Sequence, residues 1–445
     1  MNYISHTEIE KSQMLKAIGV KSVADLFKDI PQDLWPKSFD IPKGKSEFEV
    51  IEHLRSLSRK NATRLTDFIG AGFYDHYIPA AVDALVGDPK FYTAYTPYQP
   101  ECSQGWLQSI YEYQTVICEL TGLDVSNASL YDGGTALYEA AMMAVRLTGR
   151  KKIIVDSGVS LIYRTMLYTY TSNLSIEFAE TPVVHGQSCR EDIYKNLDDK
   201  TAAVIVQNPN FFGAVDDFSD IVKRVHASGA LAIASVYPVS LGMLKSPGEM
   251  GFDIATGEGQ SLGLPLSFGG PYLGFIGIKR ECMRQMPGRI VGATVDKAGL
   301  RGFVLTLQAR EQHIRRGRAT SNICSNEALC SLRAVIYLSL LGKLGIKELA
   351  RLNYQKAEFA KSALDKVPGV KVKRSSPTFN EFTVELSKNA DEVVHRMINK
   401  GFACGLPLGR FYKEMDNYLL IAVTEKRTKE EIVNFANSLE TALCS

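Results

Sequence analysis

The chain has 445 residues, of which 45% are hydrophobic. This length and composition are sufficient to bury a core in two unequal domains, and they argue against general disorder. Its 51 basic and 49 acidic residues nearly cancel, giving a formal net charge of +2. Because a nearly neutral chain has no general attraction for nucleic acid or anionic lipid, we expect a small molecule or another protein as its partner, and no nucleic acid.

No segment of the sequence indicates export or membrane insertion. Residues 1–10 lack a basic region followed by an apolar one, so we predict no secretory signal and a cytoplasmic location. The most apolar later stretches, residues 230–235 and 335–341, are far shorter than the roughly 20 residues that span a bilayer. We therefore predict a core strand and a core helix there, and no membrane span.

The eight cysteines are scattered along the chain and contain no C-x-x-C pair. Such spacing indicates neither a zinc site nor a disulfide framework. We predict reduced and mostly buried thiols, and no metal site.

Residues 1–70 are predicted to form an N-terminal helical arm. Thr7 with Glu10, and Ser46 with Glu49, have the spacing of a capping box, in which side chains satisfy free amide groups at a helix start. Because the arm carries no visible chemistry, packing against a partner subunit is the hypothesis that we keep for it.

Residues 71–330 alternate short apolar runs with amphipathic segments, which is typical of βαβ units and a mostly parallel sheet. The predicted strands are residues 153–155, 203–206 and 231–234, and the predicted helices between them are residues 161–170 and 221–227. Polar residues close the three strands, namely Asp156, Gln207 with Asn208, and Ser235. Since ligands bind outside the carboxyl ends of strands in such sheets, we expect a site at this edge.

Residues 331–445 are predicted to form a smaller α+β domain that follows the start of a long helix at residues 327–349. Its strands are expected near residues 381–386 and 418–423, and its other helices near residues 391–400 and 428–443. A large, mostly parallel sheet domain followed by a small C-terminal α+β domain is the layout of the aspartate-aminotransferase-like enzymes of fold type I, which use pyridoxal phosphate. We therefore predict an α/β fold of this class.

Residues 92–101 combine three tyrosines with two prolines. A segment so polar and so rich in proline does not fit a central strand. One interpretation is a rigid surface loop or a subunit contact. The other is a pocket wall, because tyrosine combines a stiff apolar face with a hydrogen-bonding tip.

Gly133, Gly134 and Thr135 begin a predicted helix that runs through residues 142–145. Glycines let a ligand approach the backbone closely, and the free amides of a helix start bind anions. An enzyme of fold type I would hold the cofactor phosphate at this place. The alternative is an ordinary helix start, capped by Asp132 or Thr135.

Residues 256–274 form a glycine-rich connection between two predicted strands. In a pyridoxal-phosphate enzyme this region carries the lysine that forms the Schiff base, yet no lysine lies between Lys245 and Lys279. The strand at residues 231–235 also ends without the aspartate that would pair with the pyridinium nitrogen. Two parts that make the cofactor an electron sink are therefore absent.

A basic run at residues 310–318 has two interpretations as well. It is either a solvated helix face or subunit contact, or an anion site for a carboxylate or phosphate.

Several of these segments together resemble the P protein of glycine decarboxylase. The resemblance rests on residues 95–101, 103–105, 257–260, 268–272, 287–292, 310–316 and 319–324, which occur in the same order along the chain. That family occurs either as one long chain with two homologous halves or as two subunits, and this chain is similar to the first half, the alpha subunit.

The resemblance implies a division of labour between two chains. A beta subunit would bear the lysine and bind pyridoxal phosphate covalently, so this chain is expected to have no catalytic residue of its own. The assembled enzyme, which is expected to be α2β2, would decarboxylate glycine, release CO2 and pass the aminomethyl group to the lipoyl arm of the H protein.

Within this framework we predict two groups of site residues. The first is a pocket wall presented to the beta subunit, made of Tyr95, Tyr98, Gln99, Glu101 and Ser103. The second is a vestigial cofactor region, made of Gly133, Gly134, Thr135, Gln260 and Ser261. Two rival hypotheses stay open: an independent pyridoxal-phosphate decarboxylase or aminotransferase that uses another lysine, and a non-catalytic scaffold subunit.

Overall fold

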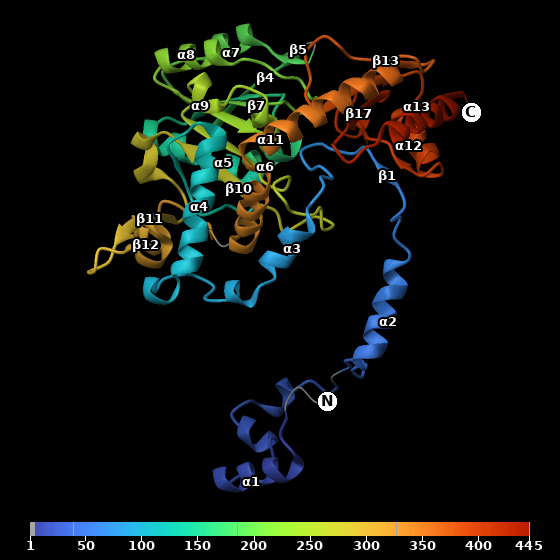
Figure 1. Ribbon diagram of the computed structural model, residues 1–445. Coiled ribbons are helices and arrows are strands. Elements are labelled where there is room, and N and C mark those ends of the chain that lie inside the picture. Colours follow the sequence, from blue (N-terminus) through green and yellow to red (C-terminus); the bar gives the residue numbers. More distant parts are fainter. Residues whose placement is uncertain (1–4, 39, 185, 326, 445) are drawn as a thin grey trace. The chain divides into compact units, whose positions relative to one another are not determined.

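The computed structural model describes residues 5–38, 40–184, 186–325 and 327–444, and the chain divides into two compact units, Met1–Thr63 and Arg64–Ser445 (Figure 1). The first unit contains α1 (Glu8–Ile18), η1 (Ala24–Phe27), η2 (Gln32–Leu34) and α2 (Glu47–Ser58), where η denotes a 3₁₀ turn. Both predicted capping boxes, at Thr7 and Ser46, are confirmed. None of the residues described in this unit is buried, so it has no core of its own.

The second unit begins earlier than the sequence indicated. Residues 64–70, which we assigned to the arm, belong to it, because β1 (Thr66–Asp67) pairs in parallel with β15 (Phe402–Ala403). Residues 64–445 form a single compact body. The boundary near residue 330 between a large and a small domain therefore stays a prediction.

A seven-stranded sheet forms the centre of the second unit, with the order β2-β10-β9-β8-β7-β3-β4. Its strands are β2 (Val125–Ser126), β3 (Lys152–Asp156), β4 (Glu177–Thr181), β7 (Thr201–Asn208), β8 (Leu231–Val236), β9 (Ile254–Glu258) and β10 (Gly274–Ile278). Neighbouring strands from β9 to β4 are parallel, and β10 is antiparallel to both of its neighbours. The mostly parallel sheet predicted from the apolar runs is confirmed.

The two faces of this sheet are buried by different helices. Side chains such as Val204 and Ala232 pack with Val222 of α8 (Ser219–Ala227) on one face. Their neighbours Ile205 and Ile233 pack against α5 (Gly133–Thr148) and α6 (Leu161–Thr171) on the other. Because successive strand residues point to opposite faces, burial on both sides requires the continuous apolar runs seen in the sequence.

The remaining elements before residue 328 are short or connect these layers. The helices are α3 (Ala80–Val86), η3 (Pro89–Phe91), η4 (Pro100–Cys102), α4 (Gln104–Thr121), α7 (Arg190–Asn196), η5 (Pro238–Gly242), α9 (Pro247–Met250), η6 (Arg280–Gln285), η7 (Gln308–Arg310), α10 (Gln312–Arg315) and η8 (Arg316–Arg318). Two antiparallel ribbons pair β5 (Val183–Val184) with β6 (Gln187–Ser188) and β11 (Ile290–Val295) with β12 (Arg301–Thr306).

The C-terminal part contains a second sheet, with the order β13-β14-β17-β16 and antiparallel pairing throughout. Its elements are α11 (Ala328–Leu364), β13 (Val370–Val372), β14 (Glu381–Leu386), α12 (Ala390–Ile398), β16 (Leu406–Pro407), η9 (Leu408–Arg410), β17 (Tyr418–Ala422) and α13 (Lys429–Cys444). The α+β character predicted for this part is confirmed.

The helix α11 extends beyond the predicted end at residue 349. It is long and apolar enough, by length and composition, to cross a membrane. However, Gly342 is not helical (φ 61°, ψ −177°), so the element consists of two shorter helices joined at a kink. Val335 and Tyr337 in the first half are buried in the central core, which supports the interpretation as a core helix.

All eight cysteines are free, as expected for reduced thiols. The prediction that most are buried is wrong, because only Cys282, Cys330 and Cys404 are buried. The other five cysteines lie on connections and helix surfaces, outside the packed core. No group of histidine, cysteine and acidic residues that could hold a metal occurs among the described residues.

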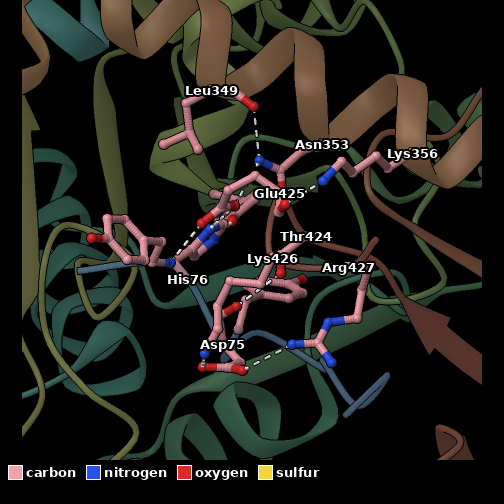
Figure 2. Close-up of polar contacts among 12 residues, drawn as sticks. Asp75, His76, Leu349, Asn353, Lys356, Thr424, Glu425, Lys426 and Arg427 are labelled. Carbon is pink, nitrogen blue, oxygen red and sulfur yellow. Dashed lines mark hydrogen bonds and ion pairs between the residues drawn. The ribbon is translucent and has the colours of Figure 1, made fainter. Parts of the chain in front are cut away.

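A polar network joins the start of the second unit to its C-terminal part (Figure 2). Glu425 lies at its centre: its carboxylate contacts His76 Nδ1 at 2.7 Å and accepts from the backbone amide of Tyr77 at 2.6 Å and from Asn353 Nδ2 at 3.1 Å. The Glu425 carbonyl accepts from Lys356 Nζ. Burial alone would raise the pKa of Glu425, but the hydrogen bond and charge of His76, together with backbone hydrogen bonds such as that from Tyr77, outweigh burial and lower the pKa to about 2.

Replacing Glu425 tests how strongly this network holds the fold. Because Glu425→Ala leaves His76 and two further donors without their acceptor, we expect it to lower the free energy of unfolding by about 2–4 kcal/mol. Urea unfolding near neutral pH measures the loss, with the exposed Glu414→Ala as control. Equal losses in the two variants would show that the network contributes nothing beyond an ordinary surface carboxylate.

Candidate functional site

The carboxyl ends of β7 and β8 meet at a small cavity. Gln207 and Ser235 reach it from the strand ends, and it is covered by Tyr74, Tyr163 and Tyr237. The other lining residues are Gly72, Ser160, Pro209, Val236 and Glu258. Its volume of about 30 Å³ is enough for one or two water molecules. The sheet edge at which we expected a ligand is therefore formed, but it is filled by side chains.

Two other polar residues predicted at this edge do not line the cavity. Asp156 Oδ1 accepts from the amide of Gly158 at 2.7 Å, and Asn208 Nδ2 donates to the carbonyl of Asp216 at 2.9 Å. Both side chains are used in the turns that follow their strands.

A single segment, residues 70–77, fills the space above the strand ends. Tyr74 is buried, and its backbone amide donates to Gln260 Oε1 at 3.0 Å. Gln260 Nε2 in turn donates to the Tyr74 carbonyl at 3.1 Å. Its hydroxyl donates to Glu381 Oε2 at 2.9 Å. A Cβ at Gly70 would overlap Glu381, so only glycine permits this close path. Gln260, predicted as part of a vestigial cofactor region, holds protein backbone in place.

The aromatic residues over the cavity form a continuous layer. The rings of Tyr74 and Tyr237 lie 4.5 Å apart, and the Tyr237 hydroxyl contacts His76 Nε2, which connects the layer to the Glu425 network. Burial raises the pKa of Tyr74, Tyr163 and Tyr237 well above that of a free phenol. These phenols therefore stay neutral and act as packing and hydrogen-bonding groups.

Glu258, the last residue of β9, connects the two parts of the predicted vestigial region, which are the start of α5 and the segment that contains Gln260. Its Oε2 accepts from the amide of Gly133 at 3.0 Å, and its Oε1 accepts from the amides of Gln260 at 2.9 Å and Leu273 at 3.0 Å. Gly133 is the first residue of α5, so a carboxylate lies where a helix start binds an anion. Burial raises the pKa of Glu258 to about 7.

The remaining predicted residues of this region are buried as well. Gly134, Thr135 and Ser261 are all buried. Asp132 caps α5, because its Oδ1 accepts from the amide of Thr135 at 2.8 Å and its Oδ2 from the Thr135 hydroxyl at 3.0 Å. The alternative interpretation, a capped helix start, therefore accounts for Asp132 and Thr135.

These residues do not fit pyridoxal phosphate. A cavity for one or two waters cannot hold an aromatic ring with a phosphate group. The two lysines that bracket the glycine-rich connection are committed elsewhere: Lys245 Nζ donates to Ser219 Oγ at 2.8 Å, and Lys279 Nζ donates to Asp253 Oδ1 at 2.6 Å.

The buried carboxyl of Glu381 gives a pH test of this packing. Burial raises its pKa from 4.5 to about 7, so its contribution to stability is complete below pH 4.5 and is lost as the pH rises through 7. We expect wild type to lose on the order of 3 kcal/mol relative to Glu381→Gln between about pH 5 and about pH 8. Urea unfolding at both pH values measures this difference. Parallel pH profiles for the two proteins would contradict it.

The tyrosine-rich segment lies on the surface rather than in the cavity at the strand ends. Tyr95 is 78% and Tyr98 is 47% exposed, and Gln99 and Glu101 are exposed as well. Ser103 differs, because it is 4% exposed and lies at the start of α4. Four of the five residues predicted for the pocket wall thus share one exposed stretch, which we call the tyrosine wall, whereas Ser103 is not part of it.

The tyrosine wall is supported from below by charged and polar groups. The Tyr98 ring lies 5.1 Å from the His313 ring, and the Arg289 guanidinium lies 5.7 Å from its centre. The Tyr95 hydroxyl approaches Cys324 Sγ at 3.7 Å. These contacts with segments far along the sequence hold the aromatic rings in a defined orientation.

A larger open cavity of about 390 Å³ lies near the tyrosine wall. Tyr131 connects the two, because its hydroxyl accepts from the amide of Cys324 at 2.9 Å and its side chain lines the cavity. The other lining residues are Thr135, Tyr138, Glu139, Met142, Arg146, Tyr170 and residues 319–323.

Arg310, the first residue of the basic run, forms hydrogen bonds with the backbone of this chain. Arg310 donates to the carbonyls of Met286 and Gly288 and pairs with Glu311 at 2.8 Å. The arginines that follow, residues 315, 316 and 318, are exposed. Arg310 is therefore structural, and the exposed remainder fits a solvated face or a subunit contact.

Sequence reasoning missed the residues that close the cavity. Glu258 lies in the glycine-rich segment whose informative feature was its lack of lysine, and an acid between two glycines at a strand end was the available signal. Tyr74, Tyr163 and Glu381 gave no comparable signal, because they come from segments far apart in the sequence.

The architecture and this edge define the class of the protein. A mostly parallel seven-stranded sheet followed by a small antiparallel sheet is the fold of the type I pyridoxal-phosphate enzymes. Glutamate decarboxylase of Lactobacillus brevis shares it with a TM-score of 0.67 at 14% identity, over 92% of this chain and 95% of that chain. The predicted fold class is confirmed.

Comparison of the whole chain identifies the family. The family model for the glycine cleavage system P-protein matches residues 1–439. The chain is 57% identical over 443 residues to the probable glycine dehydrogenase (decarboxylating) subunit 1 of Geotalea uraniireducens, covering 100% of both chains. A crystal structure of glycine decarboxylase (P-protein) of the glycine cleavage system, in inhibitor-bound form, matches with a TM-score of 0.93 and 42% identity over 100% of both chains. The chain belongs to the glycine cleavage system P-protein family.

Proposed function

We propose that this chain is the cofactor-free subunit of a two-chain glycine decarboxylase. The observation that carries the proposal is the small volume of the cavity at the strand ends, which leaves no room for pyridoxal phosphate. The family supports glycine as the substrate, and the relative's name, subunit 1, implies a second subunit. In this proposal a lysine-bearing beta subunit holds the cofactor covalently, and the assembled α2β2 enzyme releases CO2 from glycine and passes the aminomethyl group to the lipoyl arm of the H protein.

The contribution of this chain to the reaction is the tyrosine wall. Exposed tyrosines supply large contact area with little loss of conformational freedom, as at protein interfaces. Gln99 and Glu101 add hydrogen-bonding groups beside the rings. Placed against the beta subunit, such a wall excludes water from the partner's site and positions glycine for loss of its carboxyl group.

The two rival hypotheses are weighed by the same features. An independent enzyme needs an accessible lysine and a cavity for the cofactor, and the strand edge offers neither. A non-catalytic scaffold needs only the packing surfaces, so it differs from our proposal in what the tyrosine wall does.

The eight free cysteines fit a reducing compartment, which supports a cytoplasmic location.

Exchange of bicarbonate carbon with the glycine carboxyl group tests the division of labour. We expect no exchange from the purified chain and restored exchange when the lysine-bearing partner is added, because the electron sink belongs to the partner. Mass spectrometry must show that the single-chain preparation is free of partner. Robust exchange by that preparation would contradict the proposal.

Substitution within the tyrosine wall separates a catalytic wall from a packing surface. If the Tyr98 hydroxyl positions a charged group, Tyr98→Phe removes about 1.5–3 kcal/mol of interaction and slows exchange roughly ten- to more than a hundredfold in the assembled enzyme. Assembly, measured by ultracentrifugation, is expected to stay unchanged.

A nearby tyrosine provides the matched control. Tyr92 lies in the same segment and is 61% exposed, but it is not part of the tyrosine wall, so Tyr92→Phe should leave the exchange rate unchanged. Weaker assembly with normal activity in the remaining Tyr98→Phe complex would favour the scaffold hypothesis.

A further inference from the structure

The Glu258 carboxylate completes the start of α5. The helix comprises 16 residues, and its first amide, at Gly133, points to Glu258 Oε2 at 3.0 Å. A helix start carries partial positive charge and free N–H groups, so an anion is favourable there. Tyr163 closes the space beside it, because a Cβ at Gly133 would lie 2.5 Å from the Tyr163 hydroxyl oxygen.

The same carboxylate also holds the connection between β9 and β10. Its Oε1 accepts from the amides of Gln260 and Leu273, which lie near the two ends of the connection. With the Gly133 amide, the group receives three backbone hydrogen bonds from two separate segments. The carboxylate therefore uses three N–H donors that could otherwise form hydrogen bonds with phosphate oxygens.

We propose that Glu258 is the residue that excludes phosphate-bearing ligands from this chain, because its carboxylate occupies the anion position at the start of α5. The ligand class that it excludes is an inorganic phosphate or a phosphate monoester. The inference rests on the proposed function in one respect, since a chain that works beside a cofactor-bearing partner can close its own site.

Shortening Glu258 separates this role from ordinary burial. Glu258→Ala removes the carboxylate and enlarges the adjoining cavity, while the three backbone donors stay. Glu381→Ala is the matched control: Glu381 is also a buried carboxylate that accepts from a backbone amide, at Ala71, but it lies away from any helix start. Glu258→Asp keeps the charge and serves as a second, milder variant.

The experiment measures the thermal unfolding midpoint of the full chain in increasing inorganic phosphate, against sodium chloride of equal ionic strength. For Glu258→Ala we expect a saturable rise of at least about 2 °C, because binding to the folded state stabilises it. Wild type, Glu258→Asp and Glu381→Ala should show only the gradual, non-saturating rise that phosphate gives folded proteins as a stabilising salt. If Glu258→Ala does not fold in chloride, phosphate should restore folding.

The outcomes decide the proposal without reference to glycine. A response to phosphate that is equal in Glu258→Ala and Glu381→Ala would overturn it, as would a failure of phosphate to restore an unfolded Glu258→Ala chain. The same response in wild type would also overturn it, because the carboxylate would then exclude nothing. Since no partner or substrate is present, these results stay separate from the exchange experiment on the assembled enzyme.

Discussion

A buried carboxylate at the end of β9 connects the parts of the sheet edge on which the rest of the structure depends. Glu258 binds the first amide of α5 and both ends of the connection from β9 to β10, so the two segments that would surround a cofactor are bound to each other. Burying this charge is unfavourable, as its raised pKa shows, and the backbone hydrogen bonds offset that cost. The sheet edge is thereby held together by groups of this chain.

The site at the strand ends is filled by this chain's own side chains, whereas the tyrosine wall on its surface is exposed. The segment around Tyr74 fills the interior site and is held by Gln260 and Glu381, while the Glu425 network anchors the residues that follow it. The aromatic side chains of the tyrosine wall, in contrast, lie open to solvent, although Arg289 and His313 orient them. A chain with a filled site and an ordered aromatic surface is suited to completing a partner's site rather than operating its own.

The sequence was informative wherever the signal was local. The apolar runs ending at Asp156 and Ser235 predicted buried parallel strands, and the capping pairs at Thr7 and Ser46 predicted helix starts, because each depends on neighbours within a few residues. The packing that fills the cavity could not be predicted, since Tyr74 and its partner Glu381 lie 307 positions apart in the sequence. The absence of lysine indicated that the edge lacks a residue for the Schiff base. Only the structure shows which side chains fill the space there.

The central claim is that the cofactor belongs to the partner and not to this chain. Borohydride reduction of the assembled enzyme in the presence of pyridoxal phosphate, followed by peptide mapping with mass spectrometry, tests it most directly, because reduction fixes the cofactor to the lysine that holds it. The account predicts a phosphopyridoxyl group on a lysine of the partner and none on any peptide of this chain. Stoichiometric labelling of Lys245 or Lys279 would contradict it.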